Sequence, residues 1–230
     1  MKAFVAGATG YTGRNVVASL RDRDVHTVAH VRPGSRSAEE LLPEFDEAGA
    51  QVSRAEWSPE AMRAALGEAE PDLVFALLGT TSKRGKRDGS TYESVDYGLT
   101  VMLIEACEAL DHAPQFVYLS SAGAGGDRLN DYLQARARVE ERLARSPLNA
   151  LIARPSFITG EDRPEDRPAE RIGALVVDSL LGGLAALGWT GPRDRYASMT
   201  GPELGEALVR LALDGRSAVF EADAIRATLD

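Results

Sequence analysis

The sequence has very few of the residues that cross-link chains or bind metals. Its 230 residues include one cysteine, Cys107, so no disulfide can form within the chain, and a reducing compartment is expected. Cys107 lies on or beside an apolar helical stripe, which favours a core position over a nucleophile. The three histidines are scattered, at His26, His30 and His112, and we therefore expect no catalytic metal.

Long apolar runs and excess positive charge are also missing. No run approaches the roughly 20 apolar residues of a membrane-spanning helix. The first predicted strand begins within three residues of Met1, which leaves no room for a signal peptide. The 26 basic residues are outnumbered by 35 acidic ones, for a net charge of -9. The sequence therefore argues against nucleic acid or an anionic membrane as a partner, and it favours the cytoplasm as the location.

What the sequence does contain is a regular alternation of strand-like and helix-like segments. Predicted strands occupy 2–7, 25–32, 50–57, 71–80, 115–123 and 149–157. Predicted helices occupy 13–23, 37–49, 58–69, 92–111, 132–146, 174–187 and 202–215. This alternation predicts an α/β fold with a doubly wound parallel sheet, and the apolar strands indicate helices on both faces.

The domain organisation follows from length and composition. We expect a single domain over residues 1–230, because its length suits one substantial core and it contains no internal repeat or low-complexity linker. The composition changes at 160–171, which is rich in proline and charge. The prediction is a core at about 1–158 and a small substrate-side cap at about 159–230.

Three glycines follow the first predicted strand and open the first predicted helix. In "GATGYTGR", Gly7 permits a tight turn, Gly10 lets the backbone approach a diphosphate, and Gly13 allows close packing of helix on strand. The helix N-terminus then offers unpaired N–H groups to the phosphates. This context predicts a dinucleotide-binding site in a Rossmann fold.

The end of the second strand indicates which dinucleotide binds. An NAD site usually places an acidic residue there to bond the ribose hydroxyls. This sequence reads "HVRPGSR", with Arg32 at the strand end and Arg36 shortly after it. Guanidinium groups suit a 2′-phosphate, so the sequence favours NADP as the cofactor.

A second group of polar residues forms a candidate reaction centre. Ser120 and Ser121 end a buried strand, where folds of this class place their ligands. Tyr132 and Arg136 are four residues apart and share a helix face. A serine that polarises a carbonyl, a tyrosine that delivers a proton and a cation that lowers the tyrosine pKa would suit carbonyl reduction.

Five blocks of sequence carry a family resemblance over about residues 1–215. The glycine loop, "LLGTTSKRG", "FVYLSSAGA", "YLQARARVE" and "IARPSFITGEDRPEDRP" occur in the order found in atypical short-chain dehydrogenase/reductases. The chain most resembles the NADP-binding Tat-interacting-protein-like oxidoreductases, next to the NmrA-like group. The resemblance implies that Ser121, with Ser120 as a rival, and Tyr132 are the family's catalytic serine and tyrosine. It implies a cofactor site formed by Gly7, Thr9, Gly10, Tyr11, Thr12, Gly13, Arg32, Leu78, Gly79, Thr80, Arg136 and Pro155.

One departure from the family bears on activity. Arg136 stands where the family usually has lysine, and arginine stays protonated and cannot join a proton relay. Glu140, one turn further on, could pair with Arg136. Two functions are therefore open: an NADP-dependent oxidoreductase acting on a small carbonyl or alcohol, and an NADP(H)-sensing regulatory protein. A homodimer or a protein partner is also open, and a nucleotide-sugar epimerase ranks third.

Three further segments have open interpretations. Trp57 and Trp189 suit either the core or the edge of the cofactor, and Trp189 suits a substrate lid as well. The basic run 82–89 is consistent with a solvated loop or with a surface for an anionic substrate.

Overall fold

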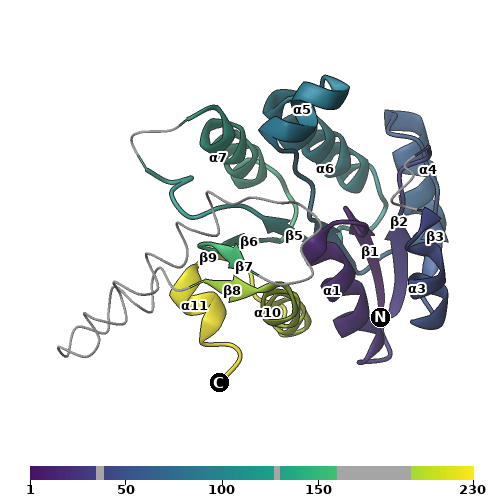
Figure 1. The fold of residues 1–230 in the computed structure, drawn as a ribbon. Coiled ribbons are helices and arrows are strands. Elements are labelled where there is room, and N and C mark those ends of the chain that lie inside the picture. The colour runs from purple at the N-terminus through teal and green to yellow at the C-terminus, as the bar shows by residue number, and fades with distance from the viewer. Residues whose placement is uncertain (35–38, 127–129, 160–197) are drawn as a thin grey trace.

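The computed structural model of the protein describes residues 1–34, 39–126, 130–159 and 198–230, and Figure 1 shows a central sheet between helices. The sheet strands are β1 Lys2–Ala6, β2 His26–His30, β3 Gln51–Ser53, β4 Leu73–Ala76, β5 Gln115–Leu119, β6 Ala150–Arg154 and β9 Val219–Glu221. Their order is β3-β2-β1-β4-β5-β6-β9, and every pairing is parallel. The predicted doubly wound α/β fold is confirmed.

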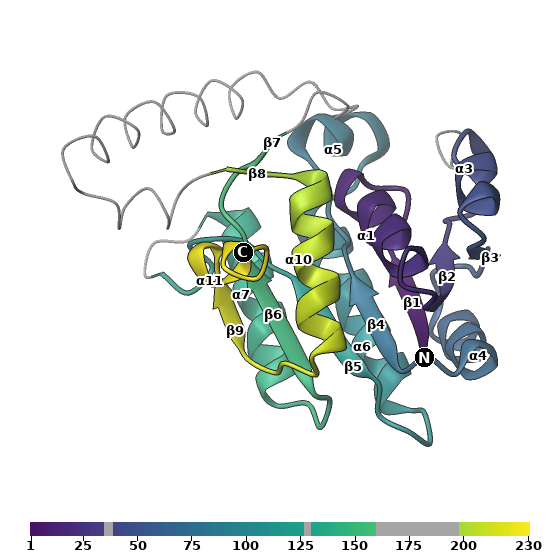
Figure 2. The ribbon, with the colours of Figure 1, turned by 90° about the horizontal axis from the view of Figure 1, so that it is seen from below.

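The helices cover both faces of this sheet. They are α1 Tyr11–Arg21, α3 Leu42–Glu47, α4 Pro59–Ala69, α5 Ser82–Asp88, η1 Tyr92–Leu99, α6 Thr100–Glu108, α7 Asp131–Ala144, α10 Gly201–Leu213 and α11 Ala222–Arg226. One apolar cluster joins α1, α3 and α10 to the sheet, and a second joins α4, α6 and α7 to it. Figure 2 shows α1 and α10 side by side on one face. Burial on both faces explains why the central strand β4 is entirely apolar and buried along its whole length.

Local sequence signals set several helix boundaries. The Ser58 side chain accepts a hydrogen bond from the Ala61 N–H, and Pro59 occupies the first turn of α4. Thr200 and Glu203 form a reciprocal capping box at the start of α10. Asn130 caps α7 through the Leu133 N–H. Each cap satisfies N–H groups that the helix itself cannot.

The long helix predicted at 92–111 is two helices of different pitch. Its first part, η1, is a π-helix, and α6 continues it from Thr100. Asp96 lies in the π-helical part and is fully buried. The apolar spacing does predict a helix here, but it carries no signal for the wider turn, because the side-chain pattern is helical in both cases.

The C-terminal residues complete the sheet and its core. The segment 199–230, which the sequence places in a cap, contributes β9 to the main sheet and α10 to the core beside α1. Close packing depends on small residues, because a Cβ added at Gly201 or Gly205 would lie within 3 Å of atoms of Tyr11 or Asn15. Two short strands, β7 Ile158–Thr159 and β8 Met199–Thr200, pair with each other in a separate small sheet.

Two other expectations have different outcomes. The run 82–89, for which the sequence leaves a solvated loop or a surface for an anionic substrate open, contains the helix α5 in place of a loop. The predicted helix 174–187 and Trp189 lie outside the described residues.

Cys107 is buried in the core, and this burial, with the nearby charge of Glu108, raises the pKa of its thiol. No helix in the described part of the chain has the length and apolar character that a bilayer crossing requires.

His30 is a buried titratable group at the end of β2. Its ring stacks on Phe4 and meets the edge of Trp57, and its Nε2 bonds the carbonyl of Ala55. Burial lowers the pKa of His30 below its usual value, against the opposing effect of the Ala55 carbonyl. Trp57 is half-buried and packs against the core cluster on its side of the sheet.

His30 should make the stability of the protein depend on pH. Because its pKa is lower in the folded chain, the unfolded chain binds the proton first as pH falls below about 6.5. The stability that His30 contributes is therefore complete above that pH and is lost on acidification, by at most about 1.4 kcal/mol per pH unit. His30→Gln keeps a donor for Ala55 but does not titrate.

The measurement is the urea unfolding free energy between pH 5 and pH 8. The variant should lose less stability on acidification than the wild type. Identical pH profiles would contradict the assignment of a titrating, buried His30.

Candidate functional site

The glycine loop between β1 and α1 is shaped by contacts that leave no room for side chains. Gly7 has φ +86°, and a Cβ there would lie 2.5 Å from the Leu77 carbonyl oxygen. A Cβ on Gly13 would lie 2.1 Å from the Gly7 carbonyl oxygen. Gly10 is exposed, with its N–H donating to Gly7. Gly13 therefore allows the close approach of α1 to the end of β1, and Gly7 lets the loop pass close to the backbone that follows β4. Gly10 leaves the surface of the loop open.

The first turn of α1 offers backbone donors next to this loop. Gly10 is the N-cap residue and has no side chain to occupy the N–H groups of the turn. Thr12 is buried and Thr9 is half-buried on either side of the cap. Unoccupied N–H groups at a helix N-terminus suit a phosphate.

The Tyr11 hydroxyl contacts two other segments of the chain. Its hydroxyl donates to the Thr159 carbonyl and accepts from the Gly201 N–H, both at 3.3 Å. Tyr11 thereby connects the glycine loop to β7 and to the start of α10. Its backbone stays in the first turn of α1, but its hydroxyl is engaged by the chain itself.

Arg32 lies just past β2 and is exposed. The preceding residue, Val31, is tied to β3 through the Ser53 carbonyl, so the backbone at the strand end is fixed. Among the described residues, no carboxylate lies within ion-pair distance of Arg32. Arg36 lies outside the described ranges.

The turn after β4 is held from behind by a buried ion pair. Arg136 donates from Nη2 to the Leu78 carbonyl at 3.0 Å and to Asp96 Oδ1 at 2.8 Å. The Asp96 Oδ2 accepts the Thr80 N–H at 2.9 Å. The turn 78–80, which the sequence assigns to the cofactor, is therefore fixed at both ends by the two partners of one ion pair.

Arg136 also fixes the end of β5. Its Nη1 donates to the Leu119 carbonyl at 2.6 Å and to the Tyr118 hydroxyl at 3.4 Å. Burial alone lowers the pKa of Arg136, but Tyr118, Tyr132 and Asp96 together raise it, so the guanidinium stays charged. Burial also raises the pKa of Tyr118, to about 12. The Nε of Arg136 is buried with no hydrogen-bond partner in the described part of the chain.

Tyr132 lies over this guanidinium. The Arg136 Cζ is 5.2 Å from the centroid of the Tyr132 ring, which is a cation–π distance. The ring of Tyr92 meets Tyr132 edge-on, with centroids 5.4 Å apart. The structure thus brings Tyr132 and Arg136 together as their spacing predicts, and it adds Tyr92 from the start of η1.

The two candidate serines have different surroundings. Ser120 is buried and donates to Glu140 Oε1 at 2.5 Å. Ser121 is half-buried, and its hydroxyl makes one long contact, 3.5 Å, with the Ala122 carbonyl. The next residue is fixed by the Pro155 carbonyl, which accepts the Ala122 N–H at 2.9 Å. Ser121 is therefore the more available hydroxyl.

Glu140 pairs with a different arginine from the one the sequence suggests. Its carboxylate is bound by Arg154, which also reaches Glu221 on β9. A pair with Arg136 is wrong, because Arg136 already has Asp96 as its carboxylate partner. Glu140 instead links α7 to β6.

Asp96 and Tyr118 are site residues that the sequence analysis does not identify. Asp96 is an acidic residue next to Val95, which lies on the apolar stripe of the predicted helix 92–111. An acidic residue beside such a stripe is the sequence signal that could have identified it. Tyr118 sits inside an apolar strand and carries no such signal. Both are recognised only when α7 brings Arg136 to them.

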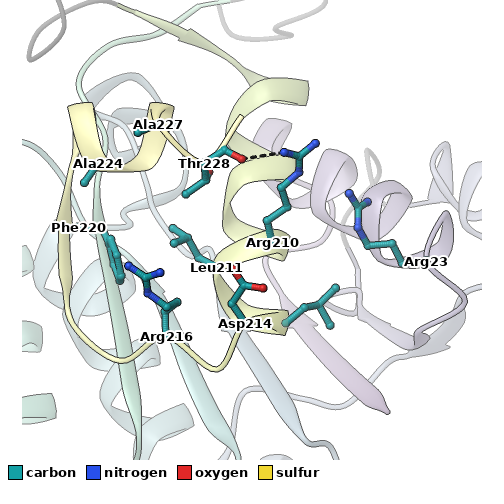
Figure 3. A pocket seen from close by; sticks show the side chains of 10 residues that line it. Arg23, Arg210, Leu211, Asp214, Arg216, Phe220, Ala224, Ala227 and Thr228 are labelled. Carbon is teal, nitrogen blue, oxygen red and sulfur yellow. Dashed lines mark hydrogen bonds between the residues drawn. The ribbon is translucent and has the colours of Figure 1, made fainter. Parts of the chain in front are cut away.

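The described residues also form a hollow away from the candidate site. It measures about 660 Å³, and Figure 3 shows Arg210 on one side of it, bonded to the Thr228 carbonyl. Its lining comes from the C-terminal end of α10, from Arg23 just after α1, and from β9 and α11. The glycine loop lies at the opposite end of α1, so this hollow is not the candidate site. Within the described ranges, no group of three or more acidic, histidine or cysteine side chains is placed to hold a metal.

The fold and the glycine loop together define a dinucleotide-binding protein of the Rossmann type. The sequence model of the NAD(P)H-binding family matches residues 7–178. The chain belongs to this family, which confirms the family resemblance at that level.

Several known proteins are similar to this chain in sequence or in fold. An uncharacterised chloroplastic protein of Arabidopsis thaliana is 29% identical over 177 residues, which cover 70% of this chain and 60% of that protein. A putative epimerase from Burkholderia cenocepacia has a similar fold, at 22% identity and TM-score 0.68 over 98% of this chain and 78% of that one. An oxidoreductase from Lactococcus lactis, at 19% identity, has TM-score 0.67 over 100% and 95% of the two chains. A UDP-glucose 4-epimerase from Thermus thermophilus, in complex with NAD, has TM-score 0.69 at 18% identity over 100% and 81%.

Gly13, in the first turn of α1, should respond very differently from Gly67, in α4, when alanine replaces each of them. Gly13→Ala forces a Cβ against the Gly7 carbonyl, so it should lower the melting temperature and weaken dinucleotide binding. Gly67 lies in α4 with nothing within 4 Å of an added Cβ. Gly67→Ala should therefore stabilise the protein by up to about 1 kcal/mol.

The measurement is thermal unfolding together with NADPH titration of both variants. A Gly13→Ala protein as stable as Gly67→Ala would contradict the close approach of α1 to β1.

Proposed function

We propose that the protein is an NADP(H)-dependent oxidoreductase that acts on a small carbonyl or alcohol. The observation that carries the proposal is the glycine cradle with an exposed Arg32 at the neighbouring strand end. Membership of the NAD(P)H-binding family supports dinucleotide binding. An exposed guanidinium with no carboxylate partner among the described residues is suited to a 2′-phosphate.

The residues present fit this cofactor. The N–H groups at the start of α1 would hold the diphosphate, because the exposed N-cap residue Gly10 has no side chain to cover them. Arg32 would hold the 2′-phosphate, and the turn 78–80 with Pro155 would border the rest of the dinucleotide. When bound, NADPH supplies hydride transfer.

The chain's own contribution would be to orient the substrate and to supply a proton. Ser121 would hold the substrate oxygen, because its hydroxyl is the less engaged of the two serines. Tyr132 would deliver the proton to that oxygen in reduction, which is general acid catalysis. Arg136 would hold the Tyr132 ring in place through their cation–π contact.

A second function has an observation in its favour. Arg136 is buried and paired with Asp96, so the lysine-dependent proton relay of related oxidoreductases has no counterpart in the chain. A protein that binds NADP(H) and signals its redox state to a partner would need no such relay. NADPH binding without turnover of any carbonyl, together with a co-purifying protein, would favour this function.

Arg32 provides the test of cofactor choice. Arg32→Ala should weaken NADPH binding by at least about tenfold, the effect of losing one charge-assisted hydrogen bond, and should change NADH binding little. The measurement is the dissociation constant of each dinucleotide by fluorescence titration. Arg210→Ala, in the distant hollow, is the control and should leave both constants unchanged. Equal losses for NADPH and NADH would remove Arg32 from the phosphate site.

Tyr132 provides the test of catalysis. Tyr132→Phe keeps the ring on Arg136 and removes only the hydroxyl, so NADPH binding should persist. Turnover of a carbonyl panel should fall by about 100-fold or more, which is the usual contribution of a general acid. The matched control is Tyr92→Phe, on the neighbouring ring. Full activity of Tyr132→Phe would exclude the tyrosine as the proton donor.

A further inference from the structure

We propose that Asp96 and Arg136 act as a positioning pair, which sets the turn 78–80 for dinucleotide binding. This inference rests on the proposed function, and it changes the role of Arg136. In place of a relay that passes protons, Arg136 is a fixed charge that holds backbone. Asp96 is the residue that makes this role possible.

The contacts of the pair converge on the turn from one side. Arg136 binds the Leu78 carbonyl and Asp96 binds the Thr80 N–H, so the residue between them, Gly79, is held at both flanks. Gly79 is exposed, whereas Thr80 and Leu78 are buried. The face of the turn that remains open is therefore the glycine, with the ion pair behind it.

The ion pair leaves no room for a side chain at Gly79. A Cβ at this position would lie 2.8 Å from Arg136 Nη2 and 3.4 Å from Asp96 Oδ1. The side chain of any other residue would therefore press on the guanidinium. The glycine that borders the site and the ion pair beneath it form one packing unit.

An arginine suits this position in a way that a lysine cannot. Its two terminal nitrogens reach carbonyls on neighbouring strands, Leu119 at 2.6 Å and Leu78 at 3.0 Å, while one of them also binds Asp96. This arrangement needs a planar fork of donors spread over two nitrogens. A lysine presents all its donors at one point and has no fork to span the two strands. The departure from the family lysine is thus matched by the surroundings of Arg136.

The π-helix supplies the other half of the pair. Asp96 lies in the middle of η1, and its side chain is fully buried against Arg136. Thr100 donates its hydroxyl to the Asp96 carbonyl, which stabilises the same turn of the helix. Wider π turns occur frequently at functional sites, and this one directs a carboxylate inward.

The pair also limits what Arg136 does for Tyr132. The guanidinium charge is balanced by the Asp96 carboxylate at 2.8 Å. The cation under the Tyr132 ring is therefore one half of a neutral pair, bound to backbone and fixed in position. Its effect on Tyr132 is to hold the ring in place.

The experiment measures NADPH dissociation constants and melting temperatures of matched variants. Arg136→Lys and Asp96→Asn each keep a polar group but break the set of contacts. The double variant Arg136→Met with Asp96→Asn removes both charges, so it avoids a buried unpaired charge and should recover stability relative to Arg136→Met alone. The control is Arg138→Lys with Glu93→Gln, which breaks an exposed ion pair between the same two helices, α7 and η1.

The expected result is a separation of stability from binding. The double variant should melt above Arg136→Met, because no unpaired buried charge remains, yet bind NADPH at least about tenfold more weakly than the wild type, since the charge-assisted bonds to the turn are lost. Arg136→Lys should also bind NADPH more weakly, with no gain in turnover. The control should match the wild type in both measurements.

Two results would overturn the inference. One is a folded double variant that binds NADPH as tightly as the wild type, which would make the pair structural only. The other is an Arg136→Lys protein with unchanged NADPH binding and higher turnover, which would make residue 136 part of the proton chemistry. A wild-type protein that binds no NADPH would instead contradict the proposed function.

Discussion

The buried ion pair between Arg136 and Asp96 is the interaction on which the architecture of the site depends. A charged pair with almost no exposure is costly to bury. This cost is offset because both terminal nitrogens of Arg136 and both carboxylate oxygens of Asp96 have hydrogen-bond partners, although the Arg136 Nε has none among the described residues. Arg136 donates to the Leu119 carbonyl, at the end of β5, and to the Leu78 carbonyl, in the turn after β4. Asp96 accepts the Thr80 N–H of the same turn. Four elements, β4, β5, η1 and α7, are thereby fixed relative to one another at the carboxyl edge of the sheet. This edge is where parallel α/β folds bind their ligands.

A second polar network stands beside the first and serves a different strand. Glu140 joins Ser120 to Arg154, and Arg154 extends the link to Glu221 on the outer strand β9. It engages Ser120, which leaves Ser121 as the less engaged hydroxyl at the end of β5. This second network explains why two adjacent serines differ. The Ser120 hydroxyl is hydrogen-bonded to Glu140, whereas the Ser121 hydroxyl makes only a long contact with a backbone carbonyl.

Much of the fold follows from local signals. The alternation of apolar strands with helices and the spacing of the glycines are patterns of neighbouring residues, so the sequence predicts these features correctly. The strand β9, the helix α5 and the π-helical pitch of η1 are not predicted. A short outer strand such as β9 is stabilised by pairing with β6. The partner of Glu140 is not predicted either, because the spacing of residues on one helix cannot reveal that Arg154, on a neighbouring strand, binds its carboxylate.

The sequence by itself determined the doubly wound fold, the dinucleotide loop and the helix that carries Tyr132 and Arg136. These features depend on periodicity and on glycine spacing, which are properties of neighbouring residues. Only the tertiary structure decided which carboxylate neutralises Arg136, which serine is available and where the Tyr11 hydroxyl binds. Those outcomes depend on contacts between residues far apart in the chain, such as Asp96 and Arg136, which are 40 positions apart. Folding brings them together, and burial then makes their pairing obligatory.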